Sequence, residues 1–234
     1  MWSVNTGVLY GVLFSGLVFY FLQKSSIKYF LGASFFAICS VVSFGSGIAT
    51  LAAGWVSLIT QKKFKLAWIW LAEMLIILGY YAFWNNITTA FTSSISPSFL
   101  SLDSIIRMGL FFISFLGAAF SFESQTVIFT FGILIICYFV FLLYRKYYLV
   151  NPAVFGFMIY VIFVATIVTL YRTELGENSV FADRYKIHSL IMVLLIYISL
   201  VDLFYSQINK KWFFITGMIM ITGSMYLASY IDGK

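Results

Sequence analysis

Apolar runs of about 17 to 25 residues recur along the whole chain, and only short polar segments separate them. An α-helix rises about 1.5 Å per residue, so each run is long enough to cross roughly 30 Å of hydrocarbon. A membrane-spanning barrel would need segments of about 10 residues with alternating polarity, and the runs show no such alternation. The sequence therefore predicts an all-α, polytopic transmembrane helical bundle.

The composition agrees with a membrane protein. Hydrophobic residues make up 62% of the chain and charged residues 9%, whereas an ordinary soluble domain carries about 25% charged residues. The net charge of +6 arises largely from lysines that stand in short groups between apolar runs. Such groups are typical of topology anchors on the cytoplasmic face. We therefore expect membrane lipids, and no nucleic acid, as partners.

The first span is expected at about residues 4–22, and it is retained because no basic segment precedes it. The next apolar block, residues 29–60, is too long for one ordinary span and contains Gly45-Ser46-Gly47. Closely spaced glycines favour a break, so this block forms two shorter helices, or one span and a re-entrant piece. Further spans are expected at about residues 66–84, 105–120, 126–144, 153–171, 187–205 and 212–230.

The basic residues leave the topology open between two solutions. A break at Gly45-Ser46-Gly47 places Lys24 and Lys62 on the same, cytoplasmic side. To join this half to the C-terminal half, one element between residues 66 and 144 must then fail to cross the membrane, or one extra crossing must exist. A single crossing by residues 29–60 gives about eight spans, but it places Lys62, Lys63 and Lys65 on the extracytoplasmic side of the membrane. We take about eight spans, with seven or nine as alternatives, in a single domain over residues 1–234.

The densest polar segment, residues 172–188, joins two predicted spans. Guanidinium groups bind phosphate or carboxylate through paired hydrogen bonds, so Arg172 and Arg184, with Tyr185, are the candidate ligands of a phosphate group. A carboxyl group and an imidazole can move a proton. The candidate catalytic residues are Glu174, Asp183 and His188.

The alternative for this segment is an ion-paired cap over two helix ends. Arg172 and Arg184 would then pair with the neighbouring acids, and His188 would be an interfacial histidine with its hydrogen bonds satisfied. No metal site or cofactor is expected, because Cys39 and Cys137 lie apart inside apolar runs, where a thiol behaves as a small hydrophobe.

Two further acids lie within predicted spans. A charged side chain at the bilayer centre costs about 2.5 to 3.5 kcal/mol on insertion scales, so Glu73 and Asp202 are candidate functional residues by default. Asp202 precedes Lys210 by about two helical turns, so its alternative position is the membrane interface. Glu73 lies deeper, where it has either a structural role in a buried hydrogen bond or a functional role.

Two patterns carry a resemblance. The first is Arg172-x3-Gly176-x7-Arg184-Tyr185 and the second is Ser43-Phe44-x2-Gly47-x6-Gly54. They resemble patterns in a group of uncharacterised bacterial polytopic membrane proteins, which are similar to GT-C-type membrane glycosyltransferases that use lipid-linked sugars. The resemblance extends over about residues 1–207. GT-C enzymes carry a catalytic acid in an early extracytoplasmic loop, and no acid precedes Lys24 here, so the chain resembles their C-terminal part.

The resemblance implies a role in cell-envelope glycan handling at the bacterial inner membrane. The protein would bind or transfer a polyprenyl-phosphate-linked sugar, alone or with a membrane partner subunit. The alternative is an oligomeric transmembrane channel or effector without enzymatic activity, in which Gly45, Gly47 and Gly54 pack subunits together and Glu73 lines a polar path. A small transporter would require paired broken helices, and the sequence indicates only one.

The segment around Ser46 also resembles, in part, the Gly-x-Ser-Gly motif of intramembrane rhomboid proteases. In that interpretation Ser46 is the nucleophile and His188 the base. The first glycine of the motif is replaced by Phe44 in this chain.

Overall fold

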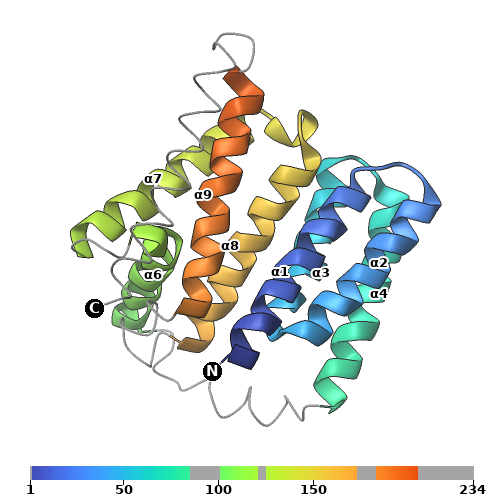
Figure 1. The fold of residues 1–234 in the computed structure, drawn as a ribbon, viewed down its shortest axis with the longest axis horizontal. Helices are drawn as coiled ribbons and strands as arrows, with labels where there is room; N and C mark the ends of the chain where they lie inside the picture. Colours follow the sequence, from blue (N-terminus) through green and yellow to red (C-terminus); the bar gives the residue numbers. More distant parts are fainter. Residues whose placement is uncertain (1, 85–100, 121–124, 173–182, 205–234) are drawn as a thin grey trace.

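The structure, a computed structural model, describes residues 2–84, 101–120, 125–172 and 183–204 (Figure 1). All regular elements in these ranges are helical, and eight of them are α-helices, which confirms the all-α prediction for this part of the chain. The predicted span at residues 212–230 and the candidate residue Glu174 lie outside the described residues. Only the backbone is described for a few helix-end residues, namely 2–5, 81, 82, 84, 172, 183–185 and 204.

The first four helices lie side by side in one half of the molecule (Figure 1). They are α1 (Trp2–Leu22), α2 (Ile27–Ser43), α3 (Ile48–Thr60) and α4 (Phe64–Trp84), and a short 3-10 turn, η1 (Gly45–Gly47), joins α2 to α3. The predicted break within residues 29–60 is thus confirmed. A Cβ atom on Gly47 would lie 2.2 Å from the carbonyl oxygen of Ser40. Only glycine therefore allows the chain to fold back so closely on the end of α2.

The second half contains α6 (Leu102–Gly117), η3 (Ala118–Phe120), α7 (Gln125–Tyr144), η4 (Tyr147–Leu149), α8 (Pro152–Arg172) and α9 (Asp183–Phe204). Helix α8 occupies the centre, in contact with α1, α3, α6 and α9. Glycines bring the backbones of α6 and α7 together, because a Cβ atom on Gly132 would lie 2.2 Å from the carbonyl oxygen of Ile113. Small residues permit this close approach of helices in membranes.

The surface of the described residues is far more apolar than that of a soluble protein, while the interior combines an apolar core with a few buried polar groups. Many large apolar side chains face outward, including Leu31, Val42 and Ile76, whereas several serines and His188 are buried. Four helical segments of the described chain are long and apolar enough to cross a membrane, by length and composition. These are Leu102–Phe120, Gln125–Tyr144, Pro152–Tyr171 and Lys186–Leu203. The chain is therefore suited to a multi-pass position in a lipid bilayer.

The basic turns of the first four helices lie at one end of the bundle. The Lys63 ammonium group contacts the backbone carbonyl groups of Leu22, Gln23 and Lys24, so the α3–α4 turn meets the α1–α2 turn. The prediction that residues 29–60 cross the membrane once, which would place these two lysine groups on opposite sides, is therefore wrong. The reason is that η1 reverses the chain, so α3 returns to the end from which α2 started (Figure 1).

Candidate functional site

Three buried hydroxyl groups from three different helices meet in the interior of the first half. The Ser15 hydroxyl of α1 lies 2.9 Å from the Ser40 hydroxyl of α2 and 2.6 Å from the Thr50 hydroxyl of α3. Ser15 and Ser40 also donate to the backbone carbonyl oxygen of Gly11, at 2.7 and 3.0 Å. All three hydroxyl-bearing side chains are fully buried. They are thus paired with one another and with α1, as buried polar groups require.

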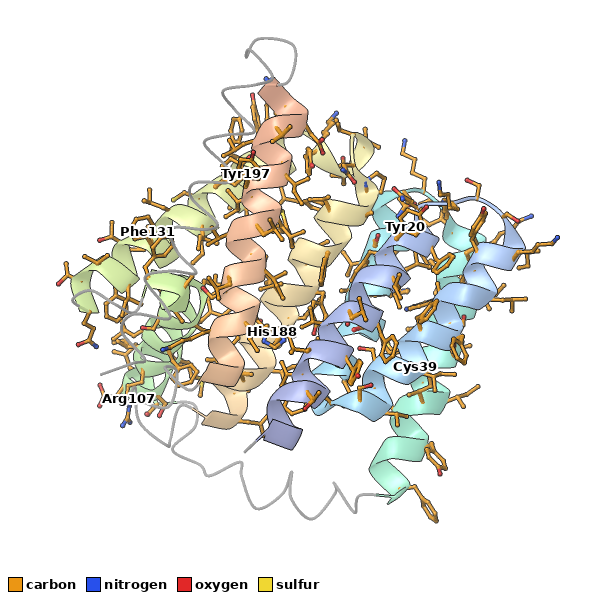
Figure 2. All side chains as sticks on the ribbon, viewed as in Figure 1. Tyr20, Cys39, Arg107, Phe131, His188 and Tyr197 are labelled. Atoms are coloured by element: carbon orange, nitrogen blue, oxygen red, sulfur yellow. The ribbon has the colours of Figure 1, made fainter. Side chains whose placement is uncertain are left out.

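A tyrosine and a histidine make a second polar contact in the interior, toward the second half. Tyr160 of α8 is fully buried, and its hydroxyl group lies 3.4 Å from Nε2 of His188 on α9. The Tyr160 ring also lies 6.4 Å from the Phe19 ring of α1, measured between ring centroids. Tyr160 therefore contacts both α9 and α1, the helix that carries Ser15. His188 is buried, and Figure 2 shows it near the middle of the view, between the ribbons of α9 and α1.

Ser46 of η1 carries a further buried hydroxyl group. It is 9% exposed, and its hydroxyl oxygen makes no hydrogen bond with the described part of the chain. The serine–histidine hydrogen bond of a protease is therefore not formed, since Tyr160, and not Ser46, faces Nε2 of His188. The rhomboid interpretation is wrong for this arrangement.

A second polar pair lies on α3 nearer the basic end of the bundle. The buried Ser57 hydroxyl accepts a hydrogen bond from Nε2 of Gln61 at 3.0 Å. Ser57 follows Thr50 by seven residues, which is two turns or about 10 Å along the same face of the helix. Gly156 of α8 packs beside Ser57 and Phe19: a Cβ atom on Gly156 would be 2.6 Å from the Phe19 ring and 3.0 Å from the Ser57 hydroxyl oxygen.

The residues predicted to hold a phosphate are placed by the backbone alone. Helix α8 ends at Arg172, and α9 begins at Asp183, so Arg172 and Arg184 belong to adjacent ends of two packed helices. The side-chain contacts of Arg172, Asp183, Arg184 and Tyr185 lie outside the described residues. His188, one turn farther into α9, is 1% exposed and lies inside the bundle, not at its interface.

The two intramembrane acids are both engaged in hydrogen bonds. The Glu73 carboxylate accepts a 2.7 Å hydrogen bond from the Ser34 hydroxyl group, which links α4 to α2. One oxygen of Asp202 accepts from the Tyr147 hydroxyl at 2.6 Å and from the Asn151 amide at 2.8 Å. Asp202 therefore joins the end of α9 to the α7–α8 turn. This contact gives Asp202 a structural role at the end of the bundle.

Sequence reasoning did not single out the hydroxyl cluster. Serine and threonine are common in apolar helices because they can donate to the carbonyl group one turn earlier on their own helix. Thr130 and Thr166 do so in this chain, with Thr126 and Ile162 as their acceptors. Sequence spacing does not separate these local bonds from contacts between helices. Only the packing of α1 against α2 and α3 brings Ser15, Ser40 and Thr50 together.

The glycines of the predicted subunit interface are used within the chain. Gly47 faces the backbone of α2, and a Cβ atom on Gly54 would lie 2.7 Å from the Trp70 indole ring. Trp70 is fully buried and donates to the carbonyl oxygen of Leu51 at 2.8 Å. Gly47 and Gly54 therefore make close helix contacts within one chain.

The described residues contain no group of three or more His, Cys, Asp or Glu side chains that could hold a metal ion. Both Cys39 and Cys137 are free thiols. Comparison with protein-family models, curated proteins and solved structures returns no match. The chain is therefore a helical bundle suited to a multi-pass position in a membrane, with a few hydrogen-bonded polar groups inside an apolar core.

Proposed function

We propose that the protein binds the phosphate-bearing head group of a polyprenyl-linked sugar at the end of the bundle where α8 ends and α9 begins. Arg172 and Arg184 are its phosphate ligands, with Tyr185 beside them. The protein acts in cell-envelope glycan handling at a bacterial inner membrane, either as an enzyme or as the lipid-binding partner of a catalytic subunit.

The observation that carries this proposal is the position of the two arginines. Residues 173–182 separate them in the sequence, yet α8 and α9 pack together, so both arginines belong to the same end of the bundle. Guanidinium groups bind phosphate oxygens bidentately. The N-terminal end of a helix, where α9 begins, also favours an anion.

The buried His188–Tyr160 pair adds support, because it lies one turn below Arg184 along α9. A proton acceptor at that depth would face a bound head group from the interior of the bundle. His188 and Asp183 are therefore the proposed acid–base groups, and Glu174 of the connecting segment is a third candidate. Phosphate binding by Arg172 and Arg184 does not depend on which of these three candidates acts as the acid or base.

The test is a binding measurement in nanodiscs with a short polyprenyl-phosphate sugar as the probe. Arg184→Ala is expected to weaken binding by about tenfold or more, since a charge-assisted bidentate contact is lost. Arg145→Ala is the matched control, because Arg145 is an exposed arginine at the opposite end of α8, next to the α7–α8 turn.

In cells, Arg184→Ala is expected to abolish the envelope glycan modification while the protein is still produced, and Arg145→Ala is expected to preserve it. Equal affinity of the two variants for the lipid probe, or an unchanged glycan profile with Arg184→Ala, would refute the proposal.

A further inference from the structure

We propose that the outward face of the α1–α2 pair is a binding site for an anionic phospholipid. The phosphate group of the lipid lies against Lys24 and Lys28 at the α1–α2 turn, and an acyl chain follows a row of aromatic rings along the two helices. This turn and the α8–α9 junction lie at opposite ends of the bundle (Figure 1). The site is therefore independent of the proposed head-group site at Arg172 and Arg184.

The aromatic rings form one continuous row across both helices. Tyr10 stacks against Phe14 on α1, with ring centroids 6.2 Å apart, and Phe14 stacks against Phe36 on α2 at 6.0 Å. Phe36 stacks in turn against Phe21 at 5.5 Å, and Phe21 contacts Tyr29 at 5.8 Å. Each ring contacts the next one, so the row passes from α1 to α2 and back as it approaches the α1–α2 turn.

The row lies on the outside of the bundle and is as long as one leaflet. Tyr10 is 53% exposed and Tyr29 41%, and the three rings between them are partly buried. Phe21 follows Tyr10 by eleven residues, which is about 16 Å along the helix. The hydrocarbon of a bilayer is roughly 30 Å thick, so one leaflet provides about half of that. A transmembrane helix of a partner would cross both leaflets, whereas an acyl chain occupies one.

The row ends beside two exposed positive charges. Lys24 and Lys28 are exposed, and the Lys24 ammonium group lies 5.4 Å from the centroid of the Tyr20 ring. Tyr20 in turn contacts Phe21 edge-on, with centroids 5.7 Å apart. Residues 1–72 contain no aspartate or glutamate, so no carboxylate of α1, α2 or α3 neutralises the two lysines. Lysines near the membrane surface attract anionic lipids. The charge at this end of the row therefore complements a lipid phosphate.

The experiment is native mass spectrometry of the purified, delipidated full chain, titrated with phosphatidylglycerol or with phosphatidylcholine that has the same acyl chains. The wild-type protein is expected to bind phosphatidylglycerol about tenfold more tightly, because only this head group carries a net negative charge. Lys24→Gln combined with Lys28→Gln should remove the preference. Arg145→Gln combined with Lys146→Gln is the matched control, which removes two exposed charges outside the α1–α2 pair and should keep the preference.

Phe36→Leu tests the ring row, because Phe36 joins the Phe14 ring to the Phe21 ring. This change is expected to weaken the binding of both lipids by about threefold or more through lost apolar contact, while the preference for phosphatidylglycerol remains. Phe83→Leu is its control, since Phe83 is 83% exposed on α4, and it should bind as the wild type does. The lysine variants change only exposed side chains, so they test the head-group contact even where Phe36→Leu does not fold.

Three results would overturn the proposal. The first is equal affinity of the wild-type protein for the two lipids, or an unchanged preference in the variant that lacks Lys24 and Lys28. The second is release of the bound lipid by millimolar inorganic phosphate, which would show that the lysines bind a free anion. The third is a lipid-free dimer that Phe36→Leu dissociates, which would show that a second copy of the chain covers this face.

Discussion

The ammonium group of Lys63 lies 2.8 Å from the carbonyl oxygen of Leu22, where it caps the end of α1. It also donates to the carbonyl oxygens of Gln23 and Lys24, at 3.0 and 3.1 Å. The last carbonyl groups of a helix lack partners within the helix, and a cation at this end is favoured by the helix dipole. One lysine side chain therefore fixes the α3–α4 turn to the α1–α2 turn.

Replacement of Lys63 by methionine is expected to lower the free energy of unfolding by about 1 to 2 kcal/mol, because three carbonyl groups lose a charged donor at a partly exposed site. The measurement is reversible unfolding in mixed micelles, with Lys65→Met as the control. Lys65 is exposed in the first turn of α4. Equal destabilisation by the two variants would contradict the capping role of Lys63.

Tyr147 is expected to make the stability depend on pH in the alkaline range. Burial, and then the hydrogen bond to Asp202, raise the pKa of Tyr147 above its ordinary value of 10.0. The folded state therefore holds this proton more tightly than the unfolded state. The resulting stability is fully present below pH 10.0 and is lost as the pH rises above that value toward the folded-state pKa.

Tyr147→Phe should therefore lose less stability than the wild type between about pH 9 and pH 11. Thermal unfolding in detergent across that range measures the difference. Tyr144→Phe is the control, since Tyr144 is 84% exposed in the same region. If Tyr147→Phe and the wild type lose stability in parallel, the Tyr147–Asp202 bond does not govern this pH dependence.

Gly54 is expected to tolerate no larger side chain. A Cβ atom there would lie 2.7 Å from the buried Trp70 ring, whose indole N–H is already bonded to Leu51. Gly54→Ala should lower the free energy of unfolding by about 1 to 3 kcal/mol through overpacking.

Gly79→Ala is the matched control in α4, where a Cβ atom would meet nothing within 4 Å. This change should leave stability unchanged or raise it by about 0.5 to 1 kcal/mol, since alanine favours the helix. Thermal unfolding of both variants tests the contrast, and a stable Gly54→Ala would show that Trp70 moves freely.

The sequence determined the helical class of the protein and most helix positions, because backbone groups in lipid must be satisfied within each apolar run. It also located the break at Gly45-Ser46-Gly47, since glycine supplies the required close approach. These features depend on local chemistry, so a linear pattern of apolar, basic and glycine residues is enough to find them.

Which polar groups meet depends on how the helices pack. Ser15, Ser40 and Thr50 are ordinary helix hydroxyls in the sequence, and their contacts arise because α2 and α3 fold back beside α1. The same reversal brings Lys63 to the end of α1 and overturns the topology inferred from lysine groups. The physical reason is that hydrogen bonds between helices depend on the rotation and depth of each helix, which packing sets and local sequence does not.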